Sequence, residues 1–523
     1  MNDCELKCSC KSGEGEDMVE NIENDCKKRD TAVRFSTELA EEYVEERAST
    51  VSKKYRCTYH AIPPIGWMND PNGFCRAMGK YHLFFQFHPY SAEWGPMHWG
   101  HYETEDFVKW KWKGVALAPE KEYDKDGCFS GSAIEKDGLM YLFYTAVKGD
   151  VQRQAVATSE NGEIFEKRGI FLDGEKLPEN CSRRDFRDPY VFQIGDRYYM
   201  ICGSQAIDGD GQVILFSSDN LFDWNFSGVL RKDPKPTLGI YECPCFCVSG
   251  GKDIIITSPQ GYKTDDWRFE NACSSIYTAG EADFKNGGFL PEYEDEIDGG
   301  FNFYAPQVLT APDGRIIMIA WMLPGIIESP AAADEWRGAM TLPREIEFKN
   351  GTLYQYPVRE IEKYRENPVR FENVKIKNDT TLNGVSGDKI EIVCDIFVGN
   401  AKKIGVKIFE SENNYASVYY DVASRKVMFD RSQTGLALYH DKNEKDASVR
   451  SVKADLKKGI ISFRIFLDVS CAEIFINGGE RTMTGNVFTK ENGKCVSFFA
   501  FGGVAKIISL EKYDIIVNDS WQN

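Results

Sequence analysis

Residues 136–145 read KDGLMYLFYT, an Asp-Gly turn followed directly by a run of strongly β-forming residues. A Gly-containing turn that joins apolar runs is a signal for a β-hairpin. Similar phrases occur five times before residue 322, with turns marked by Gly79, Gly138, Gly195, Gly251 and Gly314. The intervals between these glycines are 59, 57, 56 and 63 residues. A repeat this regular predicts five similar all-β units.

A second phrase, a polar turn that closes on an aromatic residue, follows three of these hairpins. It reads TEDFVKW at 104–110, TSENGEIF at 158–165 and SSDNLFDW at 217–224. Five small all-β units at a nearly constant period are typical of a β-propeller. A large β-sandwich is the alternative fold, but it does not predict so regular a period. We therefore expect a five-bladed β-propeller over residues 51–356.

The remainder of the chain has a different pattern. Residues 357–368 are charged and are interpreted as a linker or short helix. Residues 369–523 predict a β-sandwich, with strands expected at 389–398, 416–422, 461–469, 472–478 and 496–501. Residues 1–50 are interpreted as a tail followed by a surface helix at 37–49. The predicted fold class is all-β, a five-bladed β-propeller followed by a C-terminal β-sandwich.

Composition argues against several classes of function. A net charge of −18 over 523 residues does not suit nucleic acid or an anionic membrane as the main partner. The most apolar run, at 316–327, is too short to cross a bilayer and contains a proline. The N-terminus lacks the basic and apolar regions of an export signal. We therefore expect a cytoplasmic protein whose 16 cysteines are reduced thiols.

Two kinds of residue raise the question of a metal site. Cys243, Cys245 and Cys247 alternate along an expected strand, which places their side chains on one face about 6.6 Å apart. Three thiolates on a straight strand cannot all lie about 2.3 Å from one zinc ion, so packing is favoured. We also expect no metal at the remaining candidate ligands, which are Cys4, Cys8, Cys10, His98 and His101. With no HExxH and no phosphate-binding Gly-rich loop, the sequence predicts neither metal nor cofactor.

Each predicted hairpin is preceded by a polar cluster seven to twelve residues upstream, and three of these clusters hold a carboxylate, namely Asp70, Asp188 and Glu242. The first strand of each propeller blade lines the central channel, so equivalent positions of different blades converge on the axis. We therefore expect these three side chains in one funnel. Crowded carboxylates raise at least one pKa. An ionised carboxylate beside a protonated one is the pair that cleaves glycosides.

Several longer motifs carry a resemblance to a known family. WMNDPNG at 67–73 is highly specific, whereas Arg-Asp-Pro alone is common in turns. With FSGSA (129–133), FRDPY (186–190), YECP (241–244) and RGAMTLPRE (337–345), the chain resembles glycoside hydrolase family 32, the invertase, inulinase and levanase group. The resemblance implies a five-bladed propeller with a β-sandwich, and hydrolysis of fructofuranosides with retention of configuration.

The resemblance also implies roles for individual residues. Asp70 would be the nucleophile, Glu242 the acid/base, and Asp188 a stabiliser of the transition state that binds fructose hydroxyls. Retention would require the Asp70 and Glu242 carboxyl groups to lie about 5–5.5 Å apart. The family often has Asp where this chain has Asn302, which would alter specificity if the position contacts sugar. We expect further sugar-binding residues at Asn69, Gln86, Trp94, Phe129, Ser130, Arg187, Tyr304 and Trp336.

Family members without an export signal often cleave sucrose 6-phosphate, so the expected substrates are sucrose 6-phosphate and sucrose. No basic residue is assigned to the phosphate. The enzyme alternatives are a fructan hydrolase, a fructosyltransferase, and an inverting arabinan-type hydrolase with carboxyl groups more than about 6.5 Å apart. The non-enzyme alternative is a sugar-binding propeller without catalysis, which the presence of all three expected carboxylates argues against.

Overall fold

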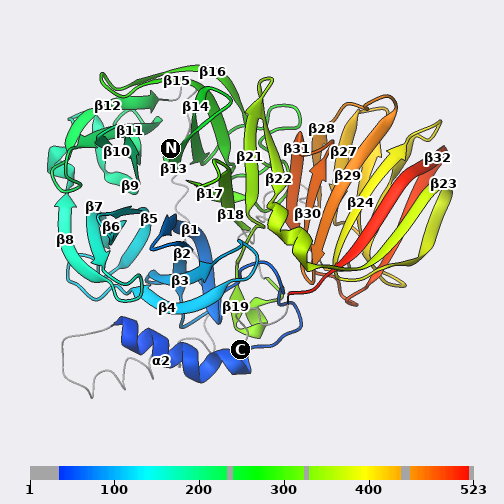
Figure 1. Ribbon diagram of the computed structural model, residues 1–523, viewed down its shortest axis with the longest axis horizontal. Helices are drawn as coiled ribbons and strands as arrows, with labels where there is room; N and C mark the ends of the chain where they lie inside the picture. Colours follow the sequence, from blue (N-terminus) through cyan, green and yellow to red (C-terminus); the bar gives the residue numbers. More distant parts are fainter. Residues whose placement is uncertain (1–34, 233–238, 323–328, 437–447, 518–523) are drawn as a thin grey trace.

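The protein has two all-β parts, a ring of five small sheets and a larger folded sheet beside it (Figure 1). This computed structural model describes residues 35–232, 239–322, 329–436 and 448–517. The ring is the predicted five-bladed β-propeller and the second part is the predicted β-sandwich, so the predicted fold class is confirmed.

Each blade is built on four antiparallel strands, of which the first is the innermost and the fourth the outermost. Blades 1 to 3 consist of β1 (Gly66–Ala77), β2 (Lys80–His88), β3 (His98–Thr104), β4 (Lys111–Leu117); β5 (Gly127–Lys136), β6 (Leu139–Lys148), β7 (Val151–Ser159), β8 (Glu166–Leu172); and β9 (Cys181–Ile194), β10 (Arg197–Ala206), β11 (Gly211–Ser218), β12 (Asn225–Lys232). Blades 4 and 5 consist of β13 (Tyr241–Ser249), β14 (Lys252–Pro259), β15 (Ile276–Asp283), β16 (Gly288–Glu296); and β17 (Tyr304–Thr310), β18 (Ile316–Met322), β21 (Arg344–Lys349), β22 (Thr352–Pro357).

The two repeated sequence phrases occupy equivalent turns in successive blades. The five glycine turns join the first strand of each blade to the second, and at Asp137 and Gly138 both φ angles are positive, as a tight hairpin turn requires. The aromatic-closing phrases join the third strand to the fourth. In each of them a hydroxyl accepts a backbone N–H three residues later, and these hydroxyls belong to Thr104, Ser159 and Ser218. The turn chemistry therefore explains the repeat.

A short insertion in blade 5 closes the ring. After β18 the chain forms a 3-10 helix at Ala332–Asp334, then β19 (Trp336–Arg337) and β20 (Ala339–Met340), before β21 begins. β20 pairs with β18, but β19 pairs in parallel with β1 of blade 1. The last blade is thus hydrogen-bonded to the first, and the propeller's ends are joined through its innermost strand.

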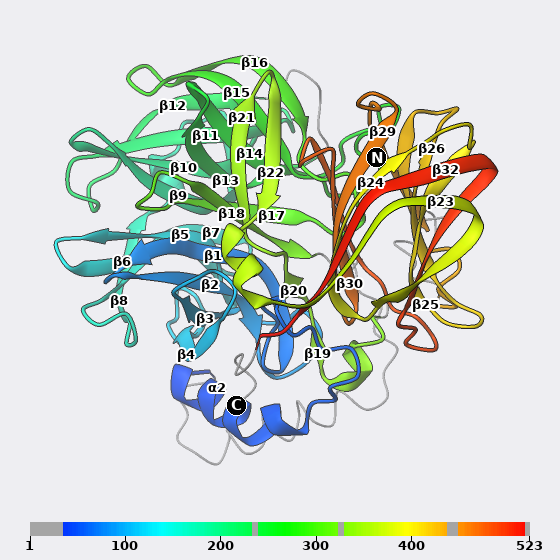
Figure 2. The same ribbon diagram turned by 45° about the vertical axis from the view of Figure 1, so that its right-hand side comes forward.

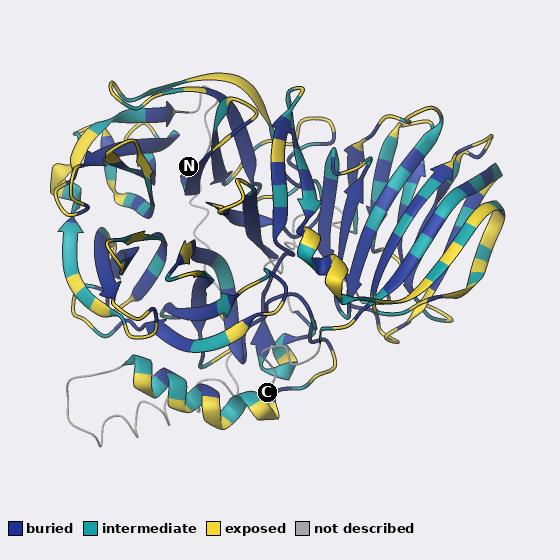
Figure 3. Ribbon diagram, viewed as in Figure 1, coloured by how far each residue is buried: buried dark blue, intermediate teal, exposed yellow. Residues whose placement is uncertain are grey.

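The apolar core lies mainly between neighbouring blades, which leaves the outer strands partly exposed (Figure 3). Between blades 2 and 3, for example, Phe143 of β6 packs in one cluster with Met200 and Phe216 of blade 3. Such blade-to-blade packing fixes the inner strands relative to one another, and therefore fixes the side chains that face the axis.

One α-helix covers the edge of blade 1. This helix, α2 (Thr37–Arg47), begins after Ser36, whose hydroxyl accepts the Leu39 N–H, and continues into a 3-10 helix at Ala48–Thr50. Ala40 and Val44 are buried, while Glu41 accepts the N–H of Val115 in β4. Within the described residues, no helix has both the length and the apolar character that a bilayer crossing needs. The tail expected before residue 35 lies outside the described residues.

The C-terminal part is one sheet folded around an apolar core. A 3-10 helix at Arg359–Tyr364 leads into this sheet. The strands of the sheet are β23 (Arg365–Ser386), β24 (Lys389–Phe397), β25 (Lys403–Glu410), β26 (Ala416–Asp421), β27 (Lys426–Asp430), β28 (Val449–Lys453), β29 (Ile460–Asp468), β30 (Cys471–Ile476), β31 (Arg481–Asn486) and β32 (Cys495–Ile515). A further short 3-10 helix, Gly174–Lys176, lies in the propeller, in the loop between blades 2 and 3. The long β32 pairs first with β25 and then with β24, so it belongs to both layers of the sandwich.

Blade 5 lies against the sandwich (Figure 2). Buried charged side chains join the two parts there. The guanidinium of Arg344 in β21 pairs with Asp298 at 3.0 Å and with Glu473 of β30 at 2.5 Å. His60, in the segment before blade 1, lies 2.9 Å from both Glu473 and Asp468. Because all these side chains are buried, the network fixes the sandwich to the propeller as one structural unit.

Candidate active site

The inner strand of every blade is interrupted by a β-bulge at an equivalent place. In each case the inner strand has one residue more than its partner, and the bulges fall between Met68 and Pro71, Phe129 and Gly131, Arg187 and Tyr190, Glu242 and Cys245, and Tyr304 and Gln307. A bulge re-aims side chains and breaks the hydrogen-bond ladder. The predicted catalytic residues lie at these bulges.

Proline and strained backbone accompany the bulges. Four of them contain a proline, which cannot donate to the ladder. The preceding residue has a positive φ at Asp188 (61°), Cys243 (46°) and Ala305 (50°), a conformation that costs roughly 1–3 kcal/mol for a non-glycine residue. The bulge of blade 2 has no proline and contains Gly131 instead. A Cβ at Gly131 would lie 1.9 Å from the Phe143 carbonyl oxygen. The fold therefore accepts strain in order to aim these side chains at the axis.

The carboxylates of Asp70 and Asp188 meet at one thiol. Asp70 Oδ2 accepts a 2.7 Å hydrogen bond from the Ser130 hydroxyl and a 3.4 Å contact from Cys243 Sγ. The same Sγ lies 3.6 Å from Asp188 Oδ2, which also accepts the Cys243 backbone N–H at 2.9 Å. Residues from blades 1 to 4 therefore converge on this point.

Glu242 is held by donors on both of its oxygens. Arg187 donates to Oε1 from Nη2 at 2.9 Å and from Nε at 3.2 Å. Tyr304 donates its hydroxyl to Oε2 at 2.5 Å, and Gln260 donates its side-chain amide to the same oxygen at 2.7 Å. Blades 3, 4 and 5 thus fix the orientation of this carboxylate.

Burial and mutual repulsion act on these acids. Burial raises the pKa of Asp70, and the charge of Glu242 raises it further. Burial raises the pKa of Asp188 to about 7, with Glu242 and Asp70 adding to the shift and Arg187 opposing it. Burial also raises the pKa of the Cys243 thiol, which therefore stays protonated and donates. A pocket crowded with acids favours a transition state that develops positive charge on the substrate.

Several predicted sugar-binding residues surround this cluster. Asn69 Oδ1 accepts the indole N–H of Trp67 at 2.7 Å. Trp94 is 58% exposed and meets the ring of Phe129 edge-on, with 6.1 Å between centroids. Gln86 is buried and donates to the backbone carbonyl of residue 128 at 2.9 Å. An exposed aromatic edge above buried polar groups suits a sugar, which presents both apolar faces and hydroxyls.

Two positions singled out in the sequence lie elsewhere. Trp336 is 3% exposed and belongs to the core cluster that contains Met68, with the Arg56 guanidinium 5.4 Å from its ring. Its neighbour Arg337 lies over the Trp67 ring instead, because successive strand residues face opposite ways.

Asn302 faces the sandwich. Its side-chain oxygen accepts the N–H of Asn486 at 3.0 Å and a contact from Arg431 Nη1 at 3.3 Å. The change from Asp to Asn at this position therefore acts on the contact between the propeller and the sandwich, rather than through a side chain aimed into the funnel.

Sequence reasoning missed residues that lie opposite the bulges on the second strands. Gln260 directly follows β14, and Thr145 in β6 pairs with Phe129 and accepts the Asp188 N–H at 3.0 Å. The sequence contained a signal for these residues, namely the pairing of strands in each predicted hairpin. This pairing places a residue of the second strand beside each residue of the first. The alternation predicted for the three cysteines holds for Cys245 and Cys247 in the blade core, but the bulge turns Cys243 into the site.

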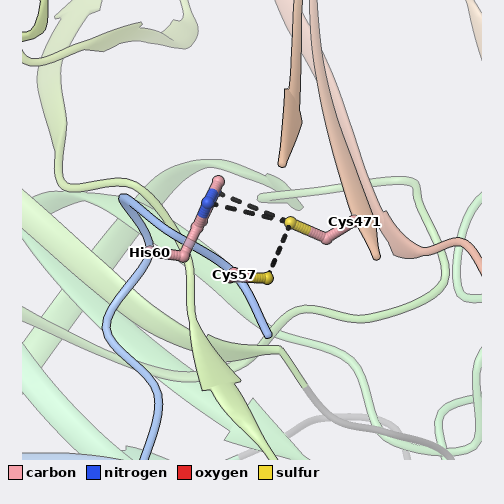
Figure 4. Close-up of side chains that lie close together, drawn as sticks. All are labelled: Cys57, His60 and Cys471. Atoms are coloured by element: carbon pink, nitrogen blue, oxygen red, sulfur yellow. Dashed lines mark hydrogen bonds between the residues drawn. The ribbon is translucent and has the colours of Figure 1, made fainter. Parts of the chain in front are cut away.

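One group of described residues has metal-ligand chemistry, namely Cys57, His60 and Cys471 (Figure 4). Cys471 Sγ lies 3.8 Å from Cys57 Sγ and 3.7 Å from His60 Nδ1. Burial lowers the pKa of His60, but hydrogen bonds to Asp468 and Glu473 outweigh it and raise the pKa to about 10. An imidazolium that donates from both nitrogens offers no lone pair, so the group does not fit a metal. Cys4, Cys8 and Cys10 lie outside the described residues.

Comparison with known families agrees with this geometry. The model of the glycosyl hydrolases family 32 N-terminal domain matches residues 60–357, and that of the family's C-terminal domain matches residues 360–514. The chain belongs to glycosyl hydrolase family 32. The resemblance noted in the sequence is therefore confirmed, and the two matched segments correspond to the propeller and the sandwich.

Relatives within family 32 cover most of the chain. A raffinose invertase from Escherichia coli is 34% identical, covering 89% of this chain and 96% of its own. A sucrose-6-phosphate hydrolase from Bacillus subtilis is 33% identical, covering 86% and 92%. A solved family 32 β-fructofuranosidase from Bombyx mori is 31% identical with a TM-score of 0.79, covering 92% and 98%. A variant of the Bombyx enzyme has been solved in complex with sucrose.

Proposed function

We propose that this protein is a retaining β-fructofuranosidase that hydrolyses sucrose 6-phosphate and sucrose. Two neighbouring carboxylates, Asp70 and Glu242, carry the proposal, and they are close enough for the charge of Glu242 to raise the pKa of Asp70. Asp70 accepts hydrogen bonds from the Ser130 hydroxyl and the Cys243 thiol, and both bonds stabilise its ionised form. Glu242 is anchored by four hydrogen bonds from three side chains. The relatives named as sucrose-6-phosphate hydrolases and as an invertase support the choice of substrates.

In the proposed mechanism the ionised Asp70 attacks the anomeric carbon of the fructosyl unit. Glu242 donates its proton to the glycosidic oxygen as that bond breaks, which releases the glucosyl part. Glu242 then takes a proton from water, which attacks the fructosyl–Asp70 ester and frees fructose with retained configuration. Asp188 accepts hydrogen bonds from fructose hydroxyls and stabilises the positive charge of the transition state.

We further propose that the protein acts in the cytoplasm. The cysteines of the described residues are free thiols, and most of them are buried in the blade and sandwich cores. Thiols in such number suit a reducing compartment. In the cytoplasm the protein would encounter a phosphorylated sugar that an uptake system delivers.

The test compares kcat/KM for sucrose 6-phosphate and sucrose on purified protein. We expect both to be cleaved, with a preference of at least tenfold for the phosphorylated sugar. Equal rates would make the enzyme a general invertase, and cleavage of neither would overturn the proposal. The raffinose invertase relative favours raffinose as a further substrate. Product analysis at high sucrose separates hydrolysis from fructosyl transfer, since transfer yields oligosaccharides.

A further inference from the structure

A ring and two guanidinium groups lie together where the propeller meets the sandwich. Phe301, just before β17, is 1% exposed. The guanidinium carbon of Arg431, just after β27, lies 3.5 Å from the centre of its ring. The guanidinium of Arg450 in β28 lies 5.1 Å from the same centre. Two positive groups are therefore buried within reach of one another at the boundary between the two parts.

The Arg431 guanidinium is only partly hydrogen-bonded. Nη1 donates to the Asn486 carbonyl oxygen at 2.7 Å and to Asn302 Oδ1 at 3.3 Å. Nε and Nη2 are buried and have no hydrogen-bond partner in the part of the chain that the structure describes. A buried donor without a partner loses its hydration and gains nothing in return, which is a common sign of an ion or water at that place.

No carboxylate reaches Arg431 among the described residues. Its side-chain partner Asn302 is a neutral amide. Glu270 acts on Arg450 rather than on Arg431. The side chain of Asn486 beside it has an oxygen without a partner, so its amide can turn its NH₂ group toward an acceptor. The site therefore combines an excess of positive charge with several donors.

We propose that a small monovalent anion, chloride in most conditions, binds beside Nε and Nη2 of Arg431 between the propeller and the sandwich. Water would satisfy the two donors of Arg431 but would leave its positive charge uncompensated in a medium of low dielectric constant, with a second guanidinium close by. An anion does both. Because the anion bridges the two parts of the protein, it acts as a structural ion, and the site is separate from the carboxylate funnel.

The first test measures Tm as chloride replaces gluconate at constant ionic strength. An ion that binds only the folded state stabilises it in proportion to the logarithm of its concentration above Kd. We expect Tm of the unmodified protein to rise by roughly 2–4 °C over the titration. Equal Tm in both salts would overturn the proposal.

Three variants make the test specific. Arg431→Met removes the cation and keeps the volume, so its Tm is expected not to respond to chloride. Asn302→Asp places a carboxylate beside Nη1, and this variant should lose the response while gaining Tm in chloride-free buffer. Asn378→Asp, on the exposed part of β23, adds the same charge elsewhere and should respond as the unmodified protein does. A chloride response that survives in Arg431→Met would contradict the proposal.

A second measurement locates the ion. Crystals grown in sodium bromide are expected to show an anomalous difference peak beside Nε and Nη2 of Arg431. A peak that is absent would place water there instead. A peak without any chloride dependence of Tm would mean an adventitious ion only, and would overturn the structural role.

Discussion

Asp70 can be tested by exchanging a single oxygen for nitrogen. We expect Asp70→Asn to fold normally and to lower kcat on sucrose by at least about 10³-fold, because the nucleophile is removed. Turnover, together with Tm as the measure of folding, checks this expectation. Retention of most activity by a folded Asp70→Asn protein would reject its assignment.

Glu242 differs from Asp70 in what its loss should do to different substrates. Glu242→Gln cannot donate a proton, so the loss of kcat/KM is expected to be large for sucrose and much smaller for an aryl fructoside with an acidic leaving group. Rates for both substrates should be compared in the unmodified protein and the variant. An equal loss for both would argue against acid catalysis at this residue.

Asp188 should show a conflict between function and stability. Its folded-state pKa of about 7 lies above the ordinary 3.8 because it is buried, so the fold loses stability as pH rises from about 4 to 7. Asp188→Asn lacks this loss. We expect the variant to be inactive yet more stable than the unmodified protein at pH 7, by on the order of 2–4 kcal/mol, with no advantage below pH 4. Urea unfolding at both pH values measures the difference, and a pH-independent difference would contradict the argument.

The sequence alone brought the three acids together because each lies a short distance, seven to nine residues, before the glycine of a recognisable turn. It could not place Trp336 or Asn302, because both lie where blade 5 departs from the repeat. β19 leaves its own blade to join β1, and Asn302 precedes β17 at the contact with the sandwich. Side-chain direction at such places depends on partners that are distant in the chain.

The bulge is the element that turns an ordinary hairpin into part of a site. Gly131 lies in the bulge of β5, beside the Ser130 that donates to Asp70. Gly131→Ala would force a methyl group against the Phe143 carbonyl. We expect a loss of about 2–3 kcal/mol in the free energy of unfolding, with a lower kcat because Ser130 moves.

Gly288→Ala is the matched control for this change. A Cβ at Gly288 would meet no atom within 4 Å, so this variant should stay within about 1 kcal/mol of the unmodified protein. Urea unfolding and turnover on sucrose measure both variants. Similar behaviour of the two would mean that the bulge tolerates a side chain.

Hairpins could be read from the sequence, and bulges could not. Turn residues have local preferences strong enough to mark five hairpins. A one-residue insertion in a strand changes no periodicity over so short a stretch, and proline at four of the five places was the only local sign of it. For the same reason, strict alternation placed Cys243 on the wrong face.

At the scale of the whole molecule, His60 links the propeller, the segment before it and the sandwich. Its pKa of about 10 in the folded state exceeds the ordinary 6.5. The stabilisation is therefore complete below pH 6.5 and is lost as pH rises toward 10. We expect the unmodified protein to lose on the order of 3–5 kcal/mol over this range relative to His60→Gln. Urea unfolding at intervals across that range measures the free energy of unfolding at each pH. The same dependence of this free energy on pH in both proteins would contradict the role of His60.

The joint between the propeller and the sandwich was beyond sequence reasoning. Arg344, Asp298 and Glu473 are far apart in the chain, and none lies in a motif that predicts a buried ion pair. Buried charges of this kind are specified by the packing of two finished parts. The sequence could therefore predict each part's architecture without predicting how they meet.

The ring closure by β19 also has a consequence for biosynthesis. The strand that carries Asp70 leaves the ribosome before its parallel neighbour, residues 336–337, which follows more than 260 residues later. Until then the edge of β1 has unpaired backbone groups, and Met68 beneath it lacks the cover that Trp336 provides. A nascent chain therefore exposes the edge of the strand that carries Asp70 until those residues have been synthesised, and chaperones protect such edges from aggregation.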